Sequence, residues 1–299
     1  MKDWDIQINY GIKTGYNDAF IISTEKRNEI LANCKTEEER RKTEELIRPI
    51  LRGRDIKRYG YEWADLYLIA TFPARHYNIN DYPAVKDYLL SFAEDNLRDA
   101  GYDWVADRYL ADFCKQKLSQ TGKFVEIKGE RIILGNTPEK ARKKTSNKWF
   151  ETQDSISYWE EFSKPKIVYM EIQTDNPNEG YPFPCFAFDN CNCVTLNTAY
   201  SMSSDTVDLR YILGVLNSAL GRFLTKLYLT QLQQRQFRML AQYVTRFPIP
   251  KEAENGTLID LVAKEIDHPS GITEDAINLL VEQLYGLTEE ESLVIRQMS

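Results

Sequence analysis

The sequence VDLRYILGVLNSALGRFLTKLYL, residues 207–229, has the clearest periodicity in the chain. Its apolar side chains recur every three or four residues, which is the spacing of one face of an α-helix. The apolar stripe consists of Leu209, Ile212, Leu213, Leu216, Leu220, Phe223 and Leu227. We therefore predict one continuous amphipathic helix here, with its apolar face packed against the core of the protein.

Short β-rich segments lie at several places before this helix. Residues 164–172 (KPKIVYMEI) read as a strand, and residues 124–134 (FVEIKGERIIL) read as a hairpin around a Lys-Gly pair. Near the start of the chain, residues 5–23 (DIQINYGIKTGYNDAFIIS) combine alternation with two glycines. This pattern predicts a second hairpin, with Lys13–Asn17 at its tip.

Other helices are predicted from their capping patterns. Thr36 and Glu39 form the pattern T-x-x-E of a capping box, which predicts a helix start. Helices are also expected near residues 258–267 and 273–285, and a last one follows Thr288. The mixture predicts an α+β fold, in which a mixed or antiparallel sheet of short hairpins packs with helices.

Two prolines in FPIPK, residues 247–251, suggest an extended linker. We therefore divide the chain into a main domain of residues 1–250 and a helical C-terminal segment of residues 251–299. The main domain holds the predicted sheet, and the segment after it is helical throughout.

The composition is that of a globular protein. Of 299 residues, 42% are hydrophobic and 28% are charged, and the formal net charge is −7. These values exclude collagen-like and mostly disordered chains. No apolar run approaches the ~20 residues that cross a bilayer, so no membrane partner is expected. Five cysteines are too few for a disulfide scaffold, so we expect a cytoplasmic protein.

The charge is unevenly distributed along the chain. Residues 48–58 contain five basic residues and one acid, and residues 115–148 contain ten basic residues and three acids. Residues 209–251 contain seven basic residues and no acid, whereas residues 252–299 contain eleven acids and two bases. Because salt screens charges beyond about 8–10 Å, the basic stretches can bind a polyanion although the total charge is negative. Ordinary solvated faces remain the alternative.

Motifs for catalysis are absent. The chain has no G-x-S-x-G, P-loop or H-E-x-x-H sequence, and it has two histidines in all. Cys185, Cys191 and Cys193 lack the paired spacing of a zinc site, so we interpret them as ordinary thiols rather than metal ligands. Glu126 and Lys128 match the E-x-K half of a Mg²⁺-dependent nuclease, a pattern that charged proteins often contain by chance.

Four segments follow one another in an informative order. They are GIKTGYNDAFII (11–22), IRPILRGRDIKRY (47–59), KPKIVYMEI (164–172) and YILGVLNSALGRF (211–223) followed by FPIPK. Together they resemble the target-recognition domain of Type IIG restriction–modification enzymes, which is close to the TaqI-like C-terminal specificity domain. Eco57I-like enzymes and BREX-type DNA methyltransferases carry similar domains.

The resemblance implies a domain that recognises double-stranded DNA in a sequence-specific way for an adenine-specific methyltransferase. In that family a catalytic core with the motif N-P-P-[YF] precedes the domain, but this chain has no Pro-Pro pair. The resemblance therefore implies a C-terminal piece of a longer polypeptide or a stand-alone subunit, without catalysis of its own. S-adenosylmethionine and Mg²⁺ are expected only in the catalytic partner, and a nuclease is a further expected partner in phage defence.

The expected DNA contacts come from the basic stretches and from the predicted hairpin tip. Phosphate contacts position such a domain, and contacts to base edges give it specificity. We predict that the contacting residues are Lys13, Thr14, Asn17, Arg52, Arg54, Lys57, Arg58, Lys143, Lys144, Arg235 and Arg238.

Each group of candidates has an alternative explanation. The 48–58 cluster can instead pair with the acidic helix at Glu37–Glu45, and the tip can be a purely structural turn. Arg235 and Arg238, which we place on one helical face, can be solvated. Asn217 and Ser218 are interpreted as a packing or helix-to-sheet hydrogen-bonding pair.

Two other functions remain open for the chain as a whole. One is a protein-interaction module of a phage-defence complex, in which the acidic C-terminal helices dock a partner. The other is a free-standing nuclease that uses Glu126 and Lys128 with Mg²⁺.

Overall fold

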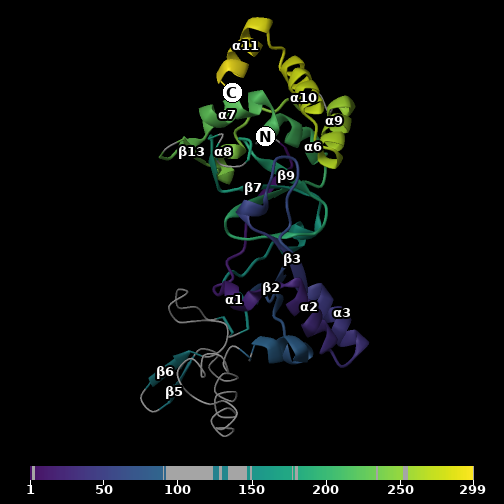
Figure 1. Cartoon of the computed structure of the whole chain (residues 1–299), viewed down its shortest axis with the longest axis vertical. Helices are drawn as coiled ribbons and strands as arrows, with labels where there is room; N and C mark the ends of the chain where they lie inside the picture. The colour runs from purple at the N-terminus through teal and green to yellow at the C-terminus, as the bar shows by residue number, and fades with distance from the viewer. Residues whose placement is uncertain are drawn as a thin grey trace. The chain divides into compact units, whose positions relative to one another are not determined.

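The computed structural model describes residues 1, 4–89, 91, 124–127, 130–133, 147–148, 150–176, 178, 181–233, 235–251 and 255–298. The chain forms two compact units (Figure 1). Unit 1 comprises Met1–Gly11, Leu51–Ala64 and Tyr158–Ser299, and unit 2 comprises Ile12–Ile50 and Asp65–Ser157. Helices and mainly antiparallel strands occur in both units, which confirms the predicted α+β class.

A four-stranded antiparallel sheet belongs to unit 1. Its strand order is β1 (Gln7–Tyr10), β11 (Ala199–Ser203), β7 (Lys166–Met170) and β9 (Phe186–Asp189). The predicted strand at residues 164–172 is thereby confirmed as β7 and the start of the next strand. The sheet joins the N-terminal residues to segments more than 150 residues away along the chain.

The predicted hairpin at residues 5–23 is wrong. β1 pairs with β11, whereas β2 (Ile21–Ser23) pairs with β4 (Leu66–Ile69) in unit 2. The physical reason is that period-2 alternation identifies strands but does not name their partners. The segment between β1 and β2 contains a short helix, α1 (Asn17–Phe20), in place of a hairpin turn.

The long helix predicted at residues 207–229 is in fact two helices. α6 (Leu209–Asn217) and α7 (Ala219–Tyr228) meet at Ser218, whose backbone is extended (φ −69°, ψ 168°). The Ser218 hydroxyl accepts a hydrogen bond from the Gly221 N–H at 3.0 Å and so caps α7. The Asn217 side chain binds both backbone groups of Phe186 in β9, at 3.0 and 2.9 Å. The helix-to-sheet interpretation is therefore confirmed for Asn217, whereas Ser218 bonds within the two helices.

The C-terminal helices complete the core of unit 1. They are α9 (Gly256–Asp267), α10 (Gly271–Leu284) and α11 (Glu289–Met298), as the sequence predicted. Val262, Ile277 and Val281 are fully buried in the same cluster as the α6 side chains. Residues 247–251 also pack there, because Phe247 is buried and the Tyr211 hydroxyl donates to the Pro250 carbonyl at 2.9 Å. The division of the chain into a main domain of residues 1–250 and a C-terminal segment of residues 251–299 stays a prediction.

Gly221 lies where α7 passes closest to the end of α6. A Cβ atom added there would lie 2.2 Å from the Val215 carbonyl oxygen and 2.4 Å from that of Leu216. We expect Gly221→Ala to destabilise unit 1 by about 1–3 kcal/mol, because backbone atoms would have to move. Chemical denaturation measures this. Gly256→Ala is the matched control, since open space surrounds Gly256 and its stability is expected to change little; equal effects would contradict the account.

Unit 2 contains a second antiparallel sheet. Its strands run in the order β3 (Ile47–Leu51), β4 and β2, beside α2 (Thr24–Ala32) and α3 (Glu37–Leu46). The capping box at the start of α3 is confirmed, because Thr36 accepts from the Glu39 N–H at 3.1 Å. β5 (Phe124–Ile127) and β6 (Glu130–Ile133) pair antiparallel, which confirms the hairpin predicted at residues 124–134.

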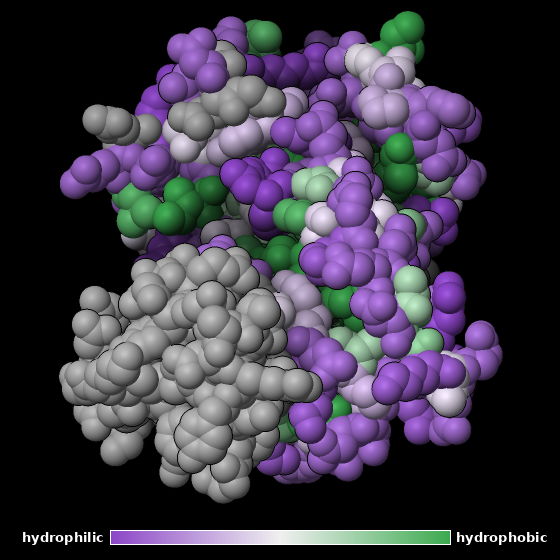
Figure 2. Space-filling model, turned by 60° about the horizontal axis from the view of Figure 1, so that its bottom comes forward, coloured by the Kyte–Doolittle hydropathy of each residue, from purple (hydrophilic) through white to green (hydrophobic). Residues whose placement is uncertain are grey.

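The remaining elements are short. They are β10 (Val194–Thr195), α8 (Ala241–Val244), a helix at residues 83–89, and 3₁₀ helices at Gly53–Asp55, Pro73–Arg75, Ile79–Asp81 and Trp159–Ser163. Among the described residues, no helix is both long and apolar enough to cross a membrane. The described part of the face in Figure 2 is mostly hydrophilic, with smaller hydrophobic areas.

Candidate nucleic-acid interface

The basic segment at residues 52–58 divides into inward and outward side chains. Arg52 forms a bidentate pair with the buried Asp55 at 2.6–3.1 Å, and Asp55 also accepts the Arg52 N–H at 2.8 Å. Arg58 donates to the Asn217 carbonyl and pairs with Glu274, and its side chain is 15% exposed. Both arginines therefore hold unit 1 together.

Arg54 and Lys57 point outward from the same segment. The Arg54 residue is exposed, and within the described residues its side chain has no ion pair or hydrogen bond. Lys57 pairs with Glu62 at 3.6 Å, but Glu62 is 82% exposed, and pairs of this kind contribute little in water. The pairing of this cluster with the acidic helix at Glu37–Glu45 stays a prediction, because the two segments belong to different units.

The different roles of Arg52 and Arg54 can be separated by mutation. We expect Arg52→Ala to cost about 1–3 kcal/mol of stability, because it leaves the buried Asp55 without its partner. The matched change Arg54→Ala is expected to leave stability unchanged, since the residue is exposed. Thermal denaturation of the two variants side by side is the measurement. A stable Arg52→Ala protein would refute this assignment.

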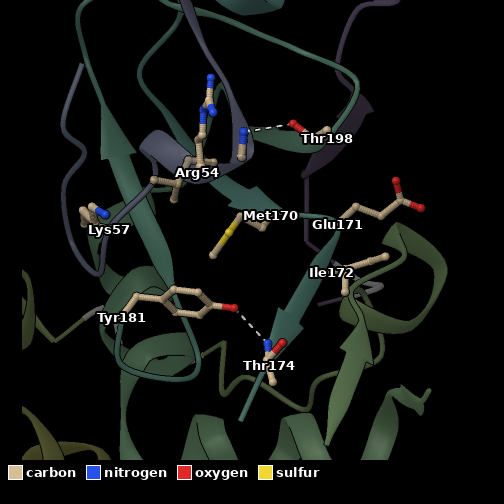
Figure 3. A pocket seen from close by; sticks show the side chains of 10 residues that line it. Arg54, Lys57, Met170, Glu171, Ile172, Thr174, Tyr181 and Thr198 are labelled. Carbon is tan, nitrogen blue, oxygen red and sulfur yellow. Dashed lines mark hydrogen bonds between the residues drawn. The ribbon is translucent and has the colours of Figure 1, made fainter. Parts of the chain in front are cut away.

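A pocket of about 480 Å³ opens beside Arg54 and Lys57. Its other walls come from the end of β7, where Met170 and Glu171 lie, and from β8 (Ile172–Thr174) (Figure 3). The Tyr181 ring lines the pocket, and its hydroxyl accepts a hydrogen bond from the Thr174 N–H at 2.9 Å. The pocket is thus a hollow with cations on one side and β8 on the other.

A small sheet continues the surface from β8. Its strand order is β12 (Thr230–Gln231), β13 (Gln236–Arg238) and β8, so β12 and β13 form an exposed hairpin. Arg235 and Arg238 therefore do not share a helical face, and this prediction is wrong. The spacing of three residues between the two arginines favours a helical face, but the pairing of β13 with β8 decides the outcome.

Acidic residues fix the cations of this hairpin. Arg238 binds the Glu171 carboxylate at 2.8 and 3.0 Å, and the Tyr10 hydroxyl donates to Glu171 at 2.9 Å. Burial and the bond to Glu171 raise the pKa of Tyr10, so it remains a donor at neutral pH. Gln231 and Gln233 are exposed near the tip, and Gln234 lies outside the described residues.

Sequence reasoning missed a third group, centred on Asp175. This carboxylate is 4% exposed and lies within 2.5 Å of Arg222, 3.1 Å of Lys226 and 3.4 Å of Arg235. The sequence does indicate that Arg222 and Lys226 are neighbours on one helix face, because they are four residues apart in a stretch without acids. Asp175 itself is distant in sequence, so only the fold could identify it.

The residues of the predicted tip belong to unit 2. Thr14 is 1% exposed, donates to the Asn17 side chain at 2.6 Å and accepts the Tyr16 N–H at 3.2 Å. The Lys13 N–H donates to Asp154 at 2.9 Å. Thr14 therefore shapes the turn, and Lys13 and Asn17 are its exposed residues.

Several predicted residues lie outside the described part of the chain. They include Lys128 and the basic stretch with Lys143 and Lys144, whereas Glu126 lies in β5. Burial raises the pKa of the Cys185 and Cys193 thiols to about 12. Among the described residues, no three His, Cys, Asp or Glu side chains are grouped so that they could hold a metal ion.

Three comparisons relate the chain to known proteins. A family model, the TaqI-like C-terminal specificity domain, matches residues 48–249. The type II methyltransferase M.PaeR7I of Pseudomonas aeruginosa is 28% identical over 151 residues, which are 50% of this chain and 24% of that protein. This chain therefore spans about a quarter of the length of that curated relative.

A solved structure supports the fold. The Type IIL restriction-modification enzyme MmeI, in complex with DNA, aligns with a TM-score of 0.50 over 97% of this chain and 36% of its own. At 12% identity the likeness concerns the fold alone. The family model, by contrast, covers more than half of the sequence, including the basic segment, the pocket and the hairpin. The chain is a member of the TaqI-like C-terminal specificity domain family.

Proposed function

We propose that this chain recognises double-stranded DNA sequence-specifically, as the specificity part of an adenine-specific restriction–modification methyltransferase. The family supports a specificity role within such enzymes. The relative named above is a methyltransferase, and the solved structure with the same fold is bound to DNA. We infer that this chain itself binds DNA and that its methyltransferase modifies adenine.

The observation that carries the proposal is the surface of unit 1 around the pocket. Arg54 and Lys57 stand on one side of it, and Arg238 stands on the hairpin that continues β8. In a chain with net charge −7, these outward cations lie in stretches that are locally basic. Such a surface binds phosphates although the whole protein is acidic.

The exposed hairpin supplies a means of reading bases. A two-stranded β-ribbon fits the major groove of B-DNA, and Gln and Arg form bidentate hydrogen bonds with adenine and guanine edges. Gln231 and Gln233 are exposed on this hairpin, together with Arg238. We assign the reading of bases to this element and the backbone contacts to Arg54 and Lys57.

Fluorescence anisotropy with duplex DNA at two salt concentrations tests the proposal. We expect saturable binding that weakens steeply with salt, because bound phosphates release counterions. Gln231→Ala and Gln233→Ala are expected to reduce the preference for the selected sequence but to keep the affinity for random DNA. Absence of binding at low salt would count against DNA recognition by this chain.

The catalytic chemistry is assigned to a partner. The methyltransferase, as a preceding domain or a separate subunit, would bind S-adenosylmethionine, and an associated nuclease would bind Mg²⁺. Adding that methyltransferase to this chain, with tritiated S-adenosylmethionine and a duplex of the selected site, is expected to label adenine. Label on cytosine would contradict the adenine assignment, and label incorporated by this chain alone would contradict its non-catalytic role.

A further inference from the structure

The cluster around Asp175 has more positive charge than its internal pairing requires. Arg222, Lys226 and Arg235 all lie within 3.4 Å of one carboxylate, so four charged groups carry a net charge of +2. Two of the cations come from α7 and the third from the β12–β13 hairpin. An assembly that served only to neutralise Asp175 would need one cation.

The donors of Arg222 are incompletely used within the described residues. Arg222 offers five N–H donors, as every guanidinium does, and it gives one hydrogen bond to Asp175. Its Nε is buried, and no described residue accepts a hydrogen bond from it. The side chains of Arg222, Lys226 and Arg235 are 26%, 28% and 59% exposed, so each one reaches solvent.

Asp175 also fixes where these cations stand. Its N–H donates to the Arg235 carbonyl at 3.0 Å, and its carboxylate contacts the Arg235 side chain. Arg235 has φ of 66°, a left-handed conformation that costs a non-glycine residue energy and that the surrounding contacts must hold. Burial opposes ionisation of Asp175, but hydrogen bonds from Lys226 and Arg222 outweigh it and lower its pKa. The carboxylate therefore stays charged and keeps the three cations together.

We propose that Arg222, Lys226 and Arg235 form a clamp for one phosphate group of the DNA backbone, preorganised by Asp175. The clamp rests on the proposed function and adds a contact outside the pocket. A phosphate has several acceptor oxygens, which suits donors that converge from a helix and a hairpin. Because Arg235 belongs to the hairpin, the bound phosphate fixes the register of the base-reading element on the duplex.

The test measures the salt dependence of DNA binding for the full 299-residue chain. Lys226→Gln removes one cation of the clamp, and Lys264→Gln on α9 is the matched control with the same change in charge. We expect Lys226→Gln to reduce the slope of log K against log salt by up to about 0.9, the value for one complete phosphate contact, on selected and random duplexes alike. The control is expected to keep the wild-type slope. Thermal melting of both variants verifies that they fold.

A second arm locates the phosphate. Each phosphate of the selected duplex is replaced in turn by an uncharged methylphosphonate. One position is expected to weaken binding of the wild type more than binding of Lys226→Gln, because in the variant that phosphate has already lost one of its three partners. If no position behaves in this way, or if Lys226→Gln keeps the full salt slope, the clamp is wrong.

Inorganic phosphate distinguishes a free-anion site from a DNA contact. One outcome would overturn the DNA assignment. In it, phosphate at constant ionic strength raises the melting temperature of the wild type but not of Lys226→Gln, and no methylphosphonate position changes DNA binding. Failure of the proposed function looks different: the wild type would then bind no duplex at all. If the wild type binds duplex DNA and Lys226→Gln keeps the wild-type salt slope, the clamp is refuted and the proposed function stands.

Discussion

Lys166→Met is expected to destabilise unit 1 by about 3–5 kcal/mol, the largest loss of stability among the changes considered. Lys166 on β7 and Asp189 on β9 are cross-strand partners, 2.5 Å apart, and both side chains are fully buried. The Asp189 carboxylate also accepts hydrogen bonds from the Tyr61 hydroxyl and from two backbone N–H groups, of Cys191 and Cys193. Removing the lysine would leave a buried, unpaired charge.

Denaturant unfolding monitored by circular dichroism measures this loss. The double change Lys166→Met with Asp189→Asn is expected to recover part of it, because no net charge is then buried. Arg41→Met is the control, since Arg41 and Glu45 are about two-thirds exposed and such pairs are worth less than ~1 kcal/mol. If Lys166→Met costs no more than Arg41→Met, the buried pair does not stabilise the four-stranded sheet of β1, β11, β7 and β9.

Reversing two charges beside the pocket is expected to have the largest effect on DNA binding. Arg54→Glu with Lys57→Glu should lower the affinity about 100-fold, because two phosphate contacts are lost and two new negative charges face the DNA backbone. Both residues project from the 53–57 segment at the mouth of the pocket, and neither holds the fold together. The melting temperature should therefore remain close to that of the wild type.

The matched control reverses two charges elsewhere in unit 1. Arg246→Glu with Lys264→Glu changes the net charge by the same amount at exposed positions away from the pocket. Anisotropy titrations of both double variants at one salt concentration compare them. An equal loss of affinity would mean that total charge, rather than the surface around the pocket, governs binding.

Local patterns in the sequence predicted much of the fold. The capping box at Thr36, the 124–134 hairpin and the C-terminal helices all depend on neighbours within a few residues. The break at Ser218 was also encoded locally, because serine is a preferred residue at the start of a helix. There its hydroxyl accepts a hydrogen bond from a backbone N–H in the first turn, here that of Gly221. The unbroken apolar stripe across it outweighed that signal in the sequence interpretation.

The site itself could be predicted only in part. The basic segment at residues 52–58 was identified, but which arginines face inward depends on partners such as Asn217 and Glu274, more than 150 residues away. The inward position of Arg52 depends on a local partner instead, because Asp55 follows it by three residues and the sequence alone could have suggested this pair. Asp175 and Glu171 were missed because strand pairing between β8 and β13 brings them to their arginines.

The measurement that tests the central claim most directly is sequencing of the DNA that this chain retains from a randomised duplex pool. We predict that a short motif becomes enriched over successive rounds, and that Gln231→Ala or Gln233→Ala changes the enriched bases without abolishing retention. Retention of DNA with no enriched motif would show binding without recognition. That result would contradict the assignment of this chain as the part that specifies the target sequence.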